Sequence, residues 1–245
     1  MKSEKAIDYY KQKIEQLSAE VELKTKWISL LAHDFKGLSS NINLLLNAMA
    51  EQHITYEVFM SMLPELKQLA AKNYKTIEST LAWVNAQSDG FNPANESINL
   101  HVLFSQLIEE YAEAIATKNL SFQFEGDETI KLNTDPFLLR FILKQLVENA
   151  IKYSNKSCTI VLQTHTNNDK VHIVVKDSGV GMNHSRLGTI GTLDGVPYTG
   201  TMDEKGAGLS LVIVNDFVEL LGGTMRVESV EGEGTMVKLQ FPWVE

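Results

Sequence analysis

The 245-residue sequence contains a single cysteine, Cys158, and no long hydrophobic run. One cysteine cannot form a disulfide within the chain, which favours a reducing cytosol as its compartment. No apolar segment approaches the ~20 residues that a membrane-spanning helix needs. Residues 1–5 also lack the apolar core of a signal peptide. The sequence therefore predicts a cytoplasmic polypeptide with no direct membrane insertion.

Positive charge is also scarce. The sequence has 22 Lys and Arg residues and 31 Asp and Glu residues, which gives a formal net charge of -9. No basic block occurs, which argues against nucleic acid as a partner and against attraction to an anionic membrane surface. The hydrophobic fraction of 44% is that of a globular chain. Its length allows two domains of modest size.

The first long pattern is a heptad repeat, in which apolar residues recur with alternating steps of three and four. Its positions are Ile7, Tyr10, Ile14, Leu17, Val21, Lys24, Ile28, Leu31, Phe35, Leu38, Ile42, Leu45 and Met49. This repeat predicts a coiled-coil helix over residues 7–50. In this register His33 takes heptad position f, which faces away from a partner helix. An exposed imidazole followed by the carboxylate of Asp34 is a candidate reactive group.

A second helical pattern follows a polar turn at residues 51–56. Its apolar positions are Phe59, Leu63, Leu66, Ala70, Ile77, Leu81 and Val84, with Pro64 near the start of the helix or at a kink. The two patterns together predict a helical hairpin. One hairpin leaves the part of the heptad repeat before Leu31 uncovered, so we expect two chains to form a four-helix bundle as a homodimer.

The composition changes to Ser, Asp, Gly, Asn and Pro after the second helix, which indicates a domain boundary. We expect residues 1–87 to form the helical domain, residues 88–96 a hinge and residues 97–245 a second domain. Strands are predicted near 97–100, 120–124, 129–132, 157–165, 170–176, 224–230 and 234–241, and helices near 102–116, 136–152 and 207–221. The whole chain is thus expected to be α+β, and the second domain α/β with a mixed or antiparallel sheet.

The predicted helix after Asp135 and Pro136 carries a polar stripe on an apolar background. Gln145, Asn149 and Lys152 lie at i, i+4 and i+7 and share one face. An amide oxygen can ligate Mg²⁺, and a lysine one turn later can neutralise phosphate. The alternative is an ordinary solvated helix face.

Two glycine-rich stretches offer further binding elements. Asp177-Ser-Gly179-Val-Gly181-Met182 follows an apolar strand, so its glycines would let a flat ligand approach while the aspartate accepts a hydrogen bond from an exocyclic amine. Gly206 and Gly208 precede a helix whose free amides could bind an anion. Each stretch taken singly is a weak signal, because Asp-x-Gly turns are common in hairpins and a glycine-rich helix start is more often a plain loop. The residues between the two stretches are consistent with a mobile flap or with a linker.

The order and spacing of these motifs resemble those of the sensor histidine kinases. The matching segments are His33-Asp34-Phe35-Lys36-Gly37, Asn149-Ala150-Ile151-Lys152-Tyr153-Ser154, Asp177 to Met182, Gly206 to Leu211, Leu221-Gly-Gly and Glu231 to Thr235. The resemblance implies a dimeric hairpin bearing the phospho-accepting histidine. It also implies an α/β sandwich ATP-binding domain of the Bergerat type, which gyrases, heat-shock chaperones and mismatch-repair ATPases share.

The same resemblance implies a role for each matched residue. His33 would be phosphorylated from ATP, with Asp34 as the neighbouring base, and the phosphoryl group would pass to an aspartate of a response-regulator receiver domain. The implied nucleotide contacts are Asn149 to Mg²⁺ between the ATP phosphates, Lys152 to phosphate, Tyr153 against the nucleotide, Asp177 to the adenine amine, and Gly179, Gly181, Gly206 and Gly208 as the walls of the pocket.

Departures from the family pattern leave alternatives open. Gln145 replaces an asparagine four residues before Asn149, Leu38 replaces a common proline, and Gly37 puts phosphatase activity in doubt. The alternatives are a GHKL-type ATPase, which Gln145 disfavours because an amide cannot accept a proton, and a catalytically degenerate dimeric scaffold. No sensory domain is recognisable, so the chain is expected to be a soluble kinase or the cytoplasmic part of a longer receptor.

Overall fold

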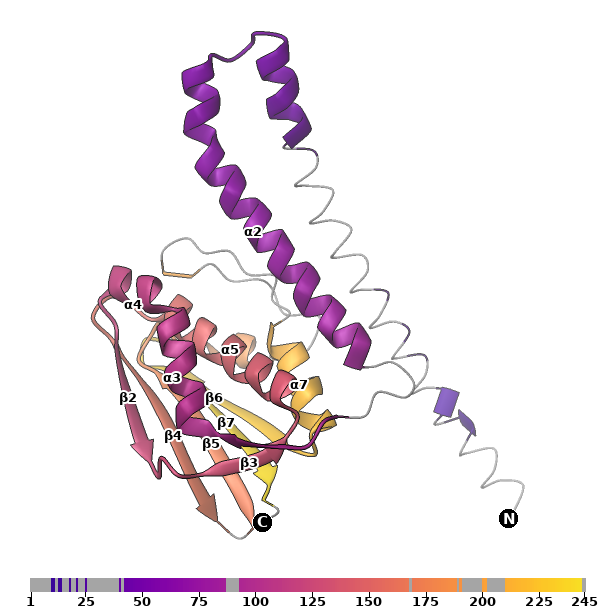
Figure 1. The fold of residues 1–245 in the computed structure, drawn as a ribbon, viewed down its shortest axis with the longest axis vertical. Coiled ribbons are helices and arrows are strands. Elements are labelled where there is room, and N and C mark those ends of the chain that lie inside the picture. The colour runs from indigo at the N-terminus through magenta and orange to yellow at the C-terminus, as the bar shows by residue number, and fades with distance from the viewer. Residues whose placement is uncertain are drawn as a thin grey trace. The chain divides into compact units, whose positions relative to one another are not determined.

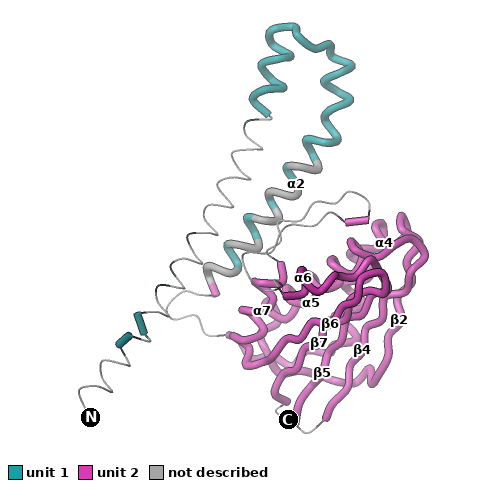
Figure 2. The backbone as a smooth tube through the Cα atoms, turned by 180° about the vertical axis from the view of Figure 1, so that it is seen from behind, with its two compact units in different colours: residues 1–85 teal, residues 86–245 magenta. Residues whose placement is uncertain are grey.

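The chain divides into two compact units, residues 1–85 and residues 86–245 (Figure 2). The computed structural model describes residues 10–11, 13–14, 18, 21, 25, 40, 42–86, 93–167, 169–188, 190, 200–201 and 210–243. Within these ranges no helix is both long and apolar enough to cross a membrane. Most of the predicted coiled-coil helix over residues 7–50 lies outside the described residues.

The first unit contains the predicted helical hairpin (Figure 1). Residues 42–50 are helical, and α2 spans Tyr56–Ala86. The first helix ends where the Gln52 backbone turns left-handed, with a φ of 57°, and the His53 amide donates to the Ala48 carbonyl at 2.8 Å. Pro64 lies inside α2, where it lacks the amide that would continue the helical hydrogen bonds.

The described part of the hairpin carries apolar side chains that are half-buried or exposed. Ile42, Leu45 and Met49 of the heptad repeat are half-buried, as are Phe59 and Leu63 of α2. None of the side chains that the structure describes between residues 40 and 85 is fully buried.

The second unit combines a helical layer with a mixed sheet. Its elements are β1 (Glu96–Asn99), α3 (Leu100–Glu110), α4 (Ala112–Lys118), β2 (Ser121–Gly126), β3 (Lys131–Thr134), α5 (Pro136–Tyr153), β4 (Thr159–Asn167), β5 (Lys170–Asp177), α6 (His184–Leu187), α7 (Ser210–Leu220), β6 (Thr224–Val230) and β7 (Gly234–Pro242). Five strands form one sheet in the order β2-β4-β5-β7-β6. Strand β2 runs parallel to β4 and the other neighbours are antiparallel. Strands β1 and β3 form a separate antiparallel pair.

The helices α3, α5 and α7 lie over one face of the sheet (Figure 1). Alternate residues of β5, Val171, Ile173 and Val175, are buried beneath them. Ile142 of α5 and Phe217 of α7 are buried on the helical side of this core. Each such side chain contributes about 1.5–3 kcal/mol by leaving water. The chain is therefore α+β, with helices followed by a mixed-sheet domain, as the sequence predicted.

The helix predicted over residues 102–116 is two helices, α3 and α4, separated at Tyr111. The Tyr111 backbone leaves the helical region, with φ -101° and ψ 13°. Its hydroxyl donates to Glu148 Oε2 of α5 at 3.3 Å. Burial, reinforced by Glu148 and Glu110, raises the pKa of this hydroxyl well above its usual range. The break thus coincides with a tertiary contact between Tyr111 and Glu148, which the spacing of apolar residues in the sequence could not predict.

Candidate functional site

The site is built on α5, whose start is fixed by Asp135. The Asp135 carboxylate accepts from the Leu138 amide at 2.9 Å and from the Ala94 amide at 2.8 Å, and Pro136 opens the helix. This capping agrees with the sequence prediction. It sets the rotation of the helix, so that its apolar residues meet the sheet.

The far end of α5 carries the predicted polar stripe. Gln145 is buried, whereas Asn149, Lys152 and Tyr153 are half-buried. The stripe is therefore not an evenly solvated face. Its accessible part is confined to the last two turns of the helix.

Two cations lie over the Tyr153 ring. Lys152 Nζ is 4.9 Å from the ring centroid, and the guanidinium carbon of Arg186 is 5.4 Å from it. Arg186 belongs to α6, a short helix capped by the Asn183 side chain, which accepts from the Arg186 amide at 3.0 Å. Sequence reasoning missed Arg186 because it treated this stretch as a flap or linker. An N-cap asparagine three residues before a basic residue was the available signal.

Asp177 ends β5 with its carboxylate buried, 7% of the residue being exposed. Its Oδ1 accepts from the Gly179 amide at 2.9 Å and from the Thr235 amide at 3.2 Å. Burial raises the pKa of Asp177 to about 6, and the two amide hydrogen bonds oppose this shift. The group is thus mostly ionised at neutral pH and held in a fixed orientation. The support from Thr235 on β7 was not predicted.

The glycines around Asp177 are required by close backbone approaches. A Cβ atom at Gly179 would overlap the Tyr153 carbonyl, and one at Gly234 would overlap the Asp177 carbonyl. Gly181 has a φ of +61° and lies against the Val230 carbonyl. These positions exclude any side chain, which brings the loop after β5 into direct backbone contact with its neighbours.

The structure joins two motifs that are far apart in the sequence. The Val180 amide donates to the Tyr153 carbonyl at 3.0 Å, so the loop after Asp177 is bonded directly to the end of α5. The half-buried Asn149, Lys152 and Tyr153 and the buried Asp177 therefore border one region of the second unit. A ligand in this region would meet an acceptor on one side and amide and cationic groups on the other.

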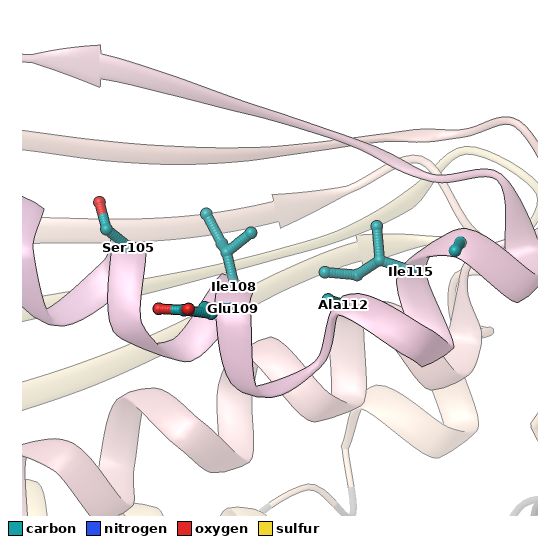
Figure 3. Close-up of a pocket in the computed structure, with 6 residues that line it drawn as sticks. Ser105, Ile108, Glu109, Ala112 and Ile115 are labelled. Atoms are coloured by element: carbon teal, nitrogen blue, oxygen red, sulfur yellow. The ribbon is translucent and has the colours of Figure 1, made fainter.

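Other predicted residues are not brought to this region by the described structure. His33, Asp34, Gly206 and Gly208 lie outside the described residues. A separate depression of about 410 Å³ lies on α3 and α4 (Figure 3). Its lining residues are Ser105, Ile108, Glu109, Ala112, Ile115 and Ala116, none of which is a predicted site residue.

No group of three or more His, Cys, Asp or Glu side chains within the described residues could hold a metal ion. The amide oxygen of Asn149 is one protein group here that could contact a divalent cation bound together with a ligand. Mg²⁺ is commonly held in this manner, through few protein groups together with substrate phosphates and water.

Similar sequences and structures are found among known proteins. Residues 134–245 match the family described as histidine kinase-, DNA gyrase B-, and HSP90-like ATPase. The sensor histidine kinase ZraS of Salmonella typhi is 27% identical over 180 residues, which cover 73% of this chain and 38% of ZraS. The sensor histidine kinase RcsC of Salmonella typhimurium is 23% identical over 251 residues, which cover 99% of this chain and 25% of RcsC.

Solved structures share the fold. The Acinetobacter baumannii histidine kinase AdeS superposes with a TM-score of 0.69 at 14% identity, covering 87% of this chain and 98% of that one. The family match over residues 134–245 identifies this part of the second unit as an ATPase domain of the type shared by histidine kinases, gyrase B and HSP90. The chain is similar in sequence to sensor histidine kinases, and it spans 38% of the length of ZraS, the first of these curated relatives.

Proposed function

We propose that this chain is an ATP-dependent protein histidine kinase that phosphorylates its own His33 and passes the phosphoryl group to an aspartate of a response-regulator receiver domain. The observation that carries the nucleotide part is the bond between the Val180 amide and the Tyr153 carbonyl. It places the Asp177 loop beside the helix end that carries Asn149 and Lys152. Adenine and phosphates, the two ends of one ligand, would each meet a suitable group.

Asp177 is suited to select adenine. Within the described residues both of its hydrogen bonds end on Oδ1, which leaves Oδ2 to accept from the exocyclic amino group of the base. Its buried position strengthens that bond, because the local dielectric is low. Gly179 and Gly181 keep side chains out of the space beside the carboxylate, and Tyr153 offers a ring to the nucleotide.

The phosphates would meet the end of α5. We assign Asn149 to Mg²⁺, which would neutralise phosphate charge when bound with ATP, and Lys152 to phosphate directly. Arg186 adds a second cation beside Tyr153. Phosphoryl transfer depends mainly on such positioning and charge neutralisation, so these residues need only hold the nucleotide in line with its acceptor. Gln145 is buried and lacks a basic oxygen, which disfavours the hydrolytic alternative.

Transfer of the γ-phosphoryl group from ATP to His33 is a single displacement at phosphorus. A ring nitrogen of neutral His33 bonds to the γ-phosphorus of ATP, the bond between that phosphorus and the β–γ bridging oxygen breaks, and ADP leaves with the electron pair. Asp34 takes the proton from the imidazole. The heptad register supports an outward ring: Ser40 and Asn47, one and two heptads after His33, are both exposed and helical.

We also infer that the chain acts in the cytoplasm as a homodimer, and the hairpin supports the dimer. Its half-buried repeat and its exposed apolar residues, among them Leu44 and Leu46, would be covered by a second hairpin. A four-helix bundle of this kind offers an exposed histidine to both the nucleotide domain and a receiver domain.

The test is to incubate the purified chain with Mg²⁺ and ATP labelled at the γ-phosphate. The proposal predicts label that is lost in acid and stable in alkali, the behaviour of a phosphoramidate, and no label in His33→Gln. Addition of receiver domains should move the label to one of them and not to its Asp→Asn variant. Label that persists in His33→Gln, or release of inorganic phosphate with no labelled chain, would overturn the proposal in favour of another acceptor or an ATPase.

A further inference from the structure

Lys118 ends α4 and is almost completely buried, with 3% of its surface exposed. Its Nζ donates to the carbonyl oxygens of Ile151 at 3.0 Å and Lys152 at 2.9 Å, and to Thr201 Oγ1 at 2.8 Å. A buried ammonium is costly unless its donors find acceptors, and an ammonium group has three donors. Three oxygen partners at hydrogen-bonding distance therefore explain why a lysine is tolerated at this position.

The two carbonyls belong to the last turn of α5, where helical carbonyls have no partner within the helix. The Ala150 carbonyl accepts the last regular helical bond, from the amide of the C-cap residue Ser154, and the three carbonyls after it are satisfied from outside the helix. The partners are the Ser154 amide for Ala150, Lys118 for Ile151, Lys118 and the Thr201 amide for Lys152, and the Val180 amide for Tyr153. A cation here also interacts favourably with the negative end of the helix dipole.

Thr201 completes the link from a distant part of the chain. Its amide donates to the Lys152 carbonyl at 3.1 Å, and its hydroxyl lies 2.8 Å from the Ser154 carbonyl and 3.2 Å from that of Lys152. The hydroxyl can therefore accept from Lys118 while it donates to a carbonyl, since it has one donor and two acceptor positions. Lys118 and Thr201 together hold residues 151–154 from two sides.

We propose that Lys118 and Thr201 form a positioning pair that fixes the last turn of α5 and thereby sets the affinity of the site for nucleotide. This inference rests on the proposed function, because the turn carries Lys152 and Tyr153 and follows Asn149. Lys118 itself is buried beneath the turn and acts through it. A site whose contacting groups are already held in place loses less entropy on binding, so loosening the turn weakens nucleotide binding.

The pair is tested by titrating Mg-ADP into the full chain by calorimetry. Lys118→Met keeps the buried chain length but removes the three donors, and Thr201→Val removes only the hydroxyl. We expect each to raise the Kd about tenfold, as misplaced contact groups do. Thr201→Ser keeps the hydroxyl and should restore the Kd to within about twofold of the original. Because the two residues form one link, the double variant should match Lys118→Met and not show the product of the two effects.

A matched control separates positioning from general loss of stability. Lys144→Met breaks another lysine contact of α5, the 2.6 Å bond from Lys144 Nζ to Glu110 Oε1, but leaves the last turn intact. It should leave the Kd for Mg-ADP unchanged. Hydrogen exchange without nucleotide should quicken at the Ser154, Val180 and Thr201 amides in Lys118→Met and not in Lys144→Met.

The outcomes distinguish this inference from the proposed function. Failure of the unaltered chain to bind Mg-ADP would reject the proposed function. Normal binding by the unaltered chain together with a Kd unchanged in both Lys118→Met and Thr201→Val would reject only the positioning pair. If Lys118→Met does not fold, the comparison of Thr201→Val with Thr201→Ser decides, and equal Kd values for these two would overturn the inference.

Discussion

The Val180 amide donates a hydrogen bond of 3.0 Å to the carbonyl oxygen of Tyr153. This bond closes the loop that follows Asp177 onto the end of α5, and Gly179 makes the approach possible because it lacks a Cβ atom. The carboxylate that we assign to adenine and the helix end that we assign to the phosphates are thereby held at a fixed separation. Disturbing this junction should affect nucleotide binding more than it affects the sheet below.

Gly179→Ala tests the junction directly. The new Cβ would overlap the Tyr153 carbonyl, so the loop must move, and we expect the affinity for Mg-ADP to fall more than tenfold with a loss of stability of about 1–3 kcal/mol. Gly188→Ala is the matched control, because its Cβ would meet nothing closer than 3.6 Å. Calorimetric titration of both variants provides the measurement. Equal Kd values for the two would show that the junction does not shape the site.

Asp177→Asn is expected to remove nucleotide binding. An amide still accepts from Gly179 and Thr235 through its oxygen, but the other position becomes an amino group that opposes the adenine amine. Asn149→Asp should have the same result for a different reason, since it places a negative charge beside the phosphates. Light scattering should show that both variants keep the oligomeric state of the unaltered chain. Retained affinity in both variants would refute the assignment of the site.

The same Asp177→Asn substitution should stabilise the nucleotide-free second unit near neutral pH. Burial raises the pKa of Asp177 from 3.8 to about 6, so the folded unit still binds this proton at pH values where the unfolded chain has released it. Between about pH 4 and pH 6 the contribution of this group to the free energy of unfolding therefore falls as pH rises. The shift corresponds to a cost of about 2–3 kcal/mol above pH 6.

Scanning calorimetry at pH 7.5 and pH 4.5 measures this effect. The asparagine variant should unfold at a higher temperature than the unaltered chain at pH 7.5, and the difference should shrink at pH 4.5, where the aspartic acid is protonated in the folded unit. A constant difference at both pH values would mean that desolvation of the charge is not its cause. A stability gain together with lost binding is typical of a residue retained for function.

Leu45→Glu tests the hairpin as the dimer interface. Leu45 lies on the heptad repeat and is half-buried, so a charge there should weaken the association of two chains by at least tenfold. Asn47→Glu adds the same charge at heptad position f, where the side chain is exposed, and should leave association unchanged. Analytical ultracentrifugation over a range of concentrations compares them. A monomeric unaltered chain would contradict the predicted bundle outright.

Local signals in the sequence predicted much of the second unit. The cap at Asp135, the proline at position 136 and the apolar spacing defined α5 almost to the residue, because all three act within one helix. Alternation identified β5 in the same manner. The parallel pairing of β2 with β4, and the separation of β1 and β3 from the main sheet, were not specified, since pairing depends on residues distant in sequence.

The sequence offered contact residues for the candidate site, which stay a prediction, but not the residues that hold them in place. Asn149, Lys152 and Asp177 carry recognisable polar chemistry at defined spacings. Lys118 and Thr201 do not, because a lysine in sequence is expected on the surface, and its burial is decided by acceptors contributed from α5. Residues that hold a site in place leave little local pattern, which is why only the folded chain shows them.

Hydrogen exchange of the full chain with and without Mg-ADP tests the central claim most directly. If nucleotide is held between the Asp177 loop and the end of α5, the amides of residues 149–154 and 177–181 should exchange more slowly when Mg-ADP is present, and this protection should vanish in Asp177→Asn. Protection confined to residues 105–116 of the α3–α4 depression, or no protection while Mg-ADP is bound, would contradict the account.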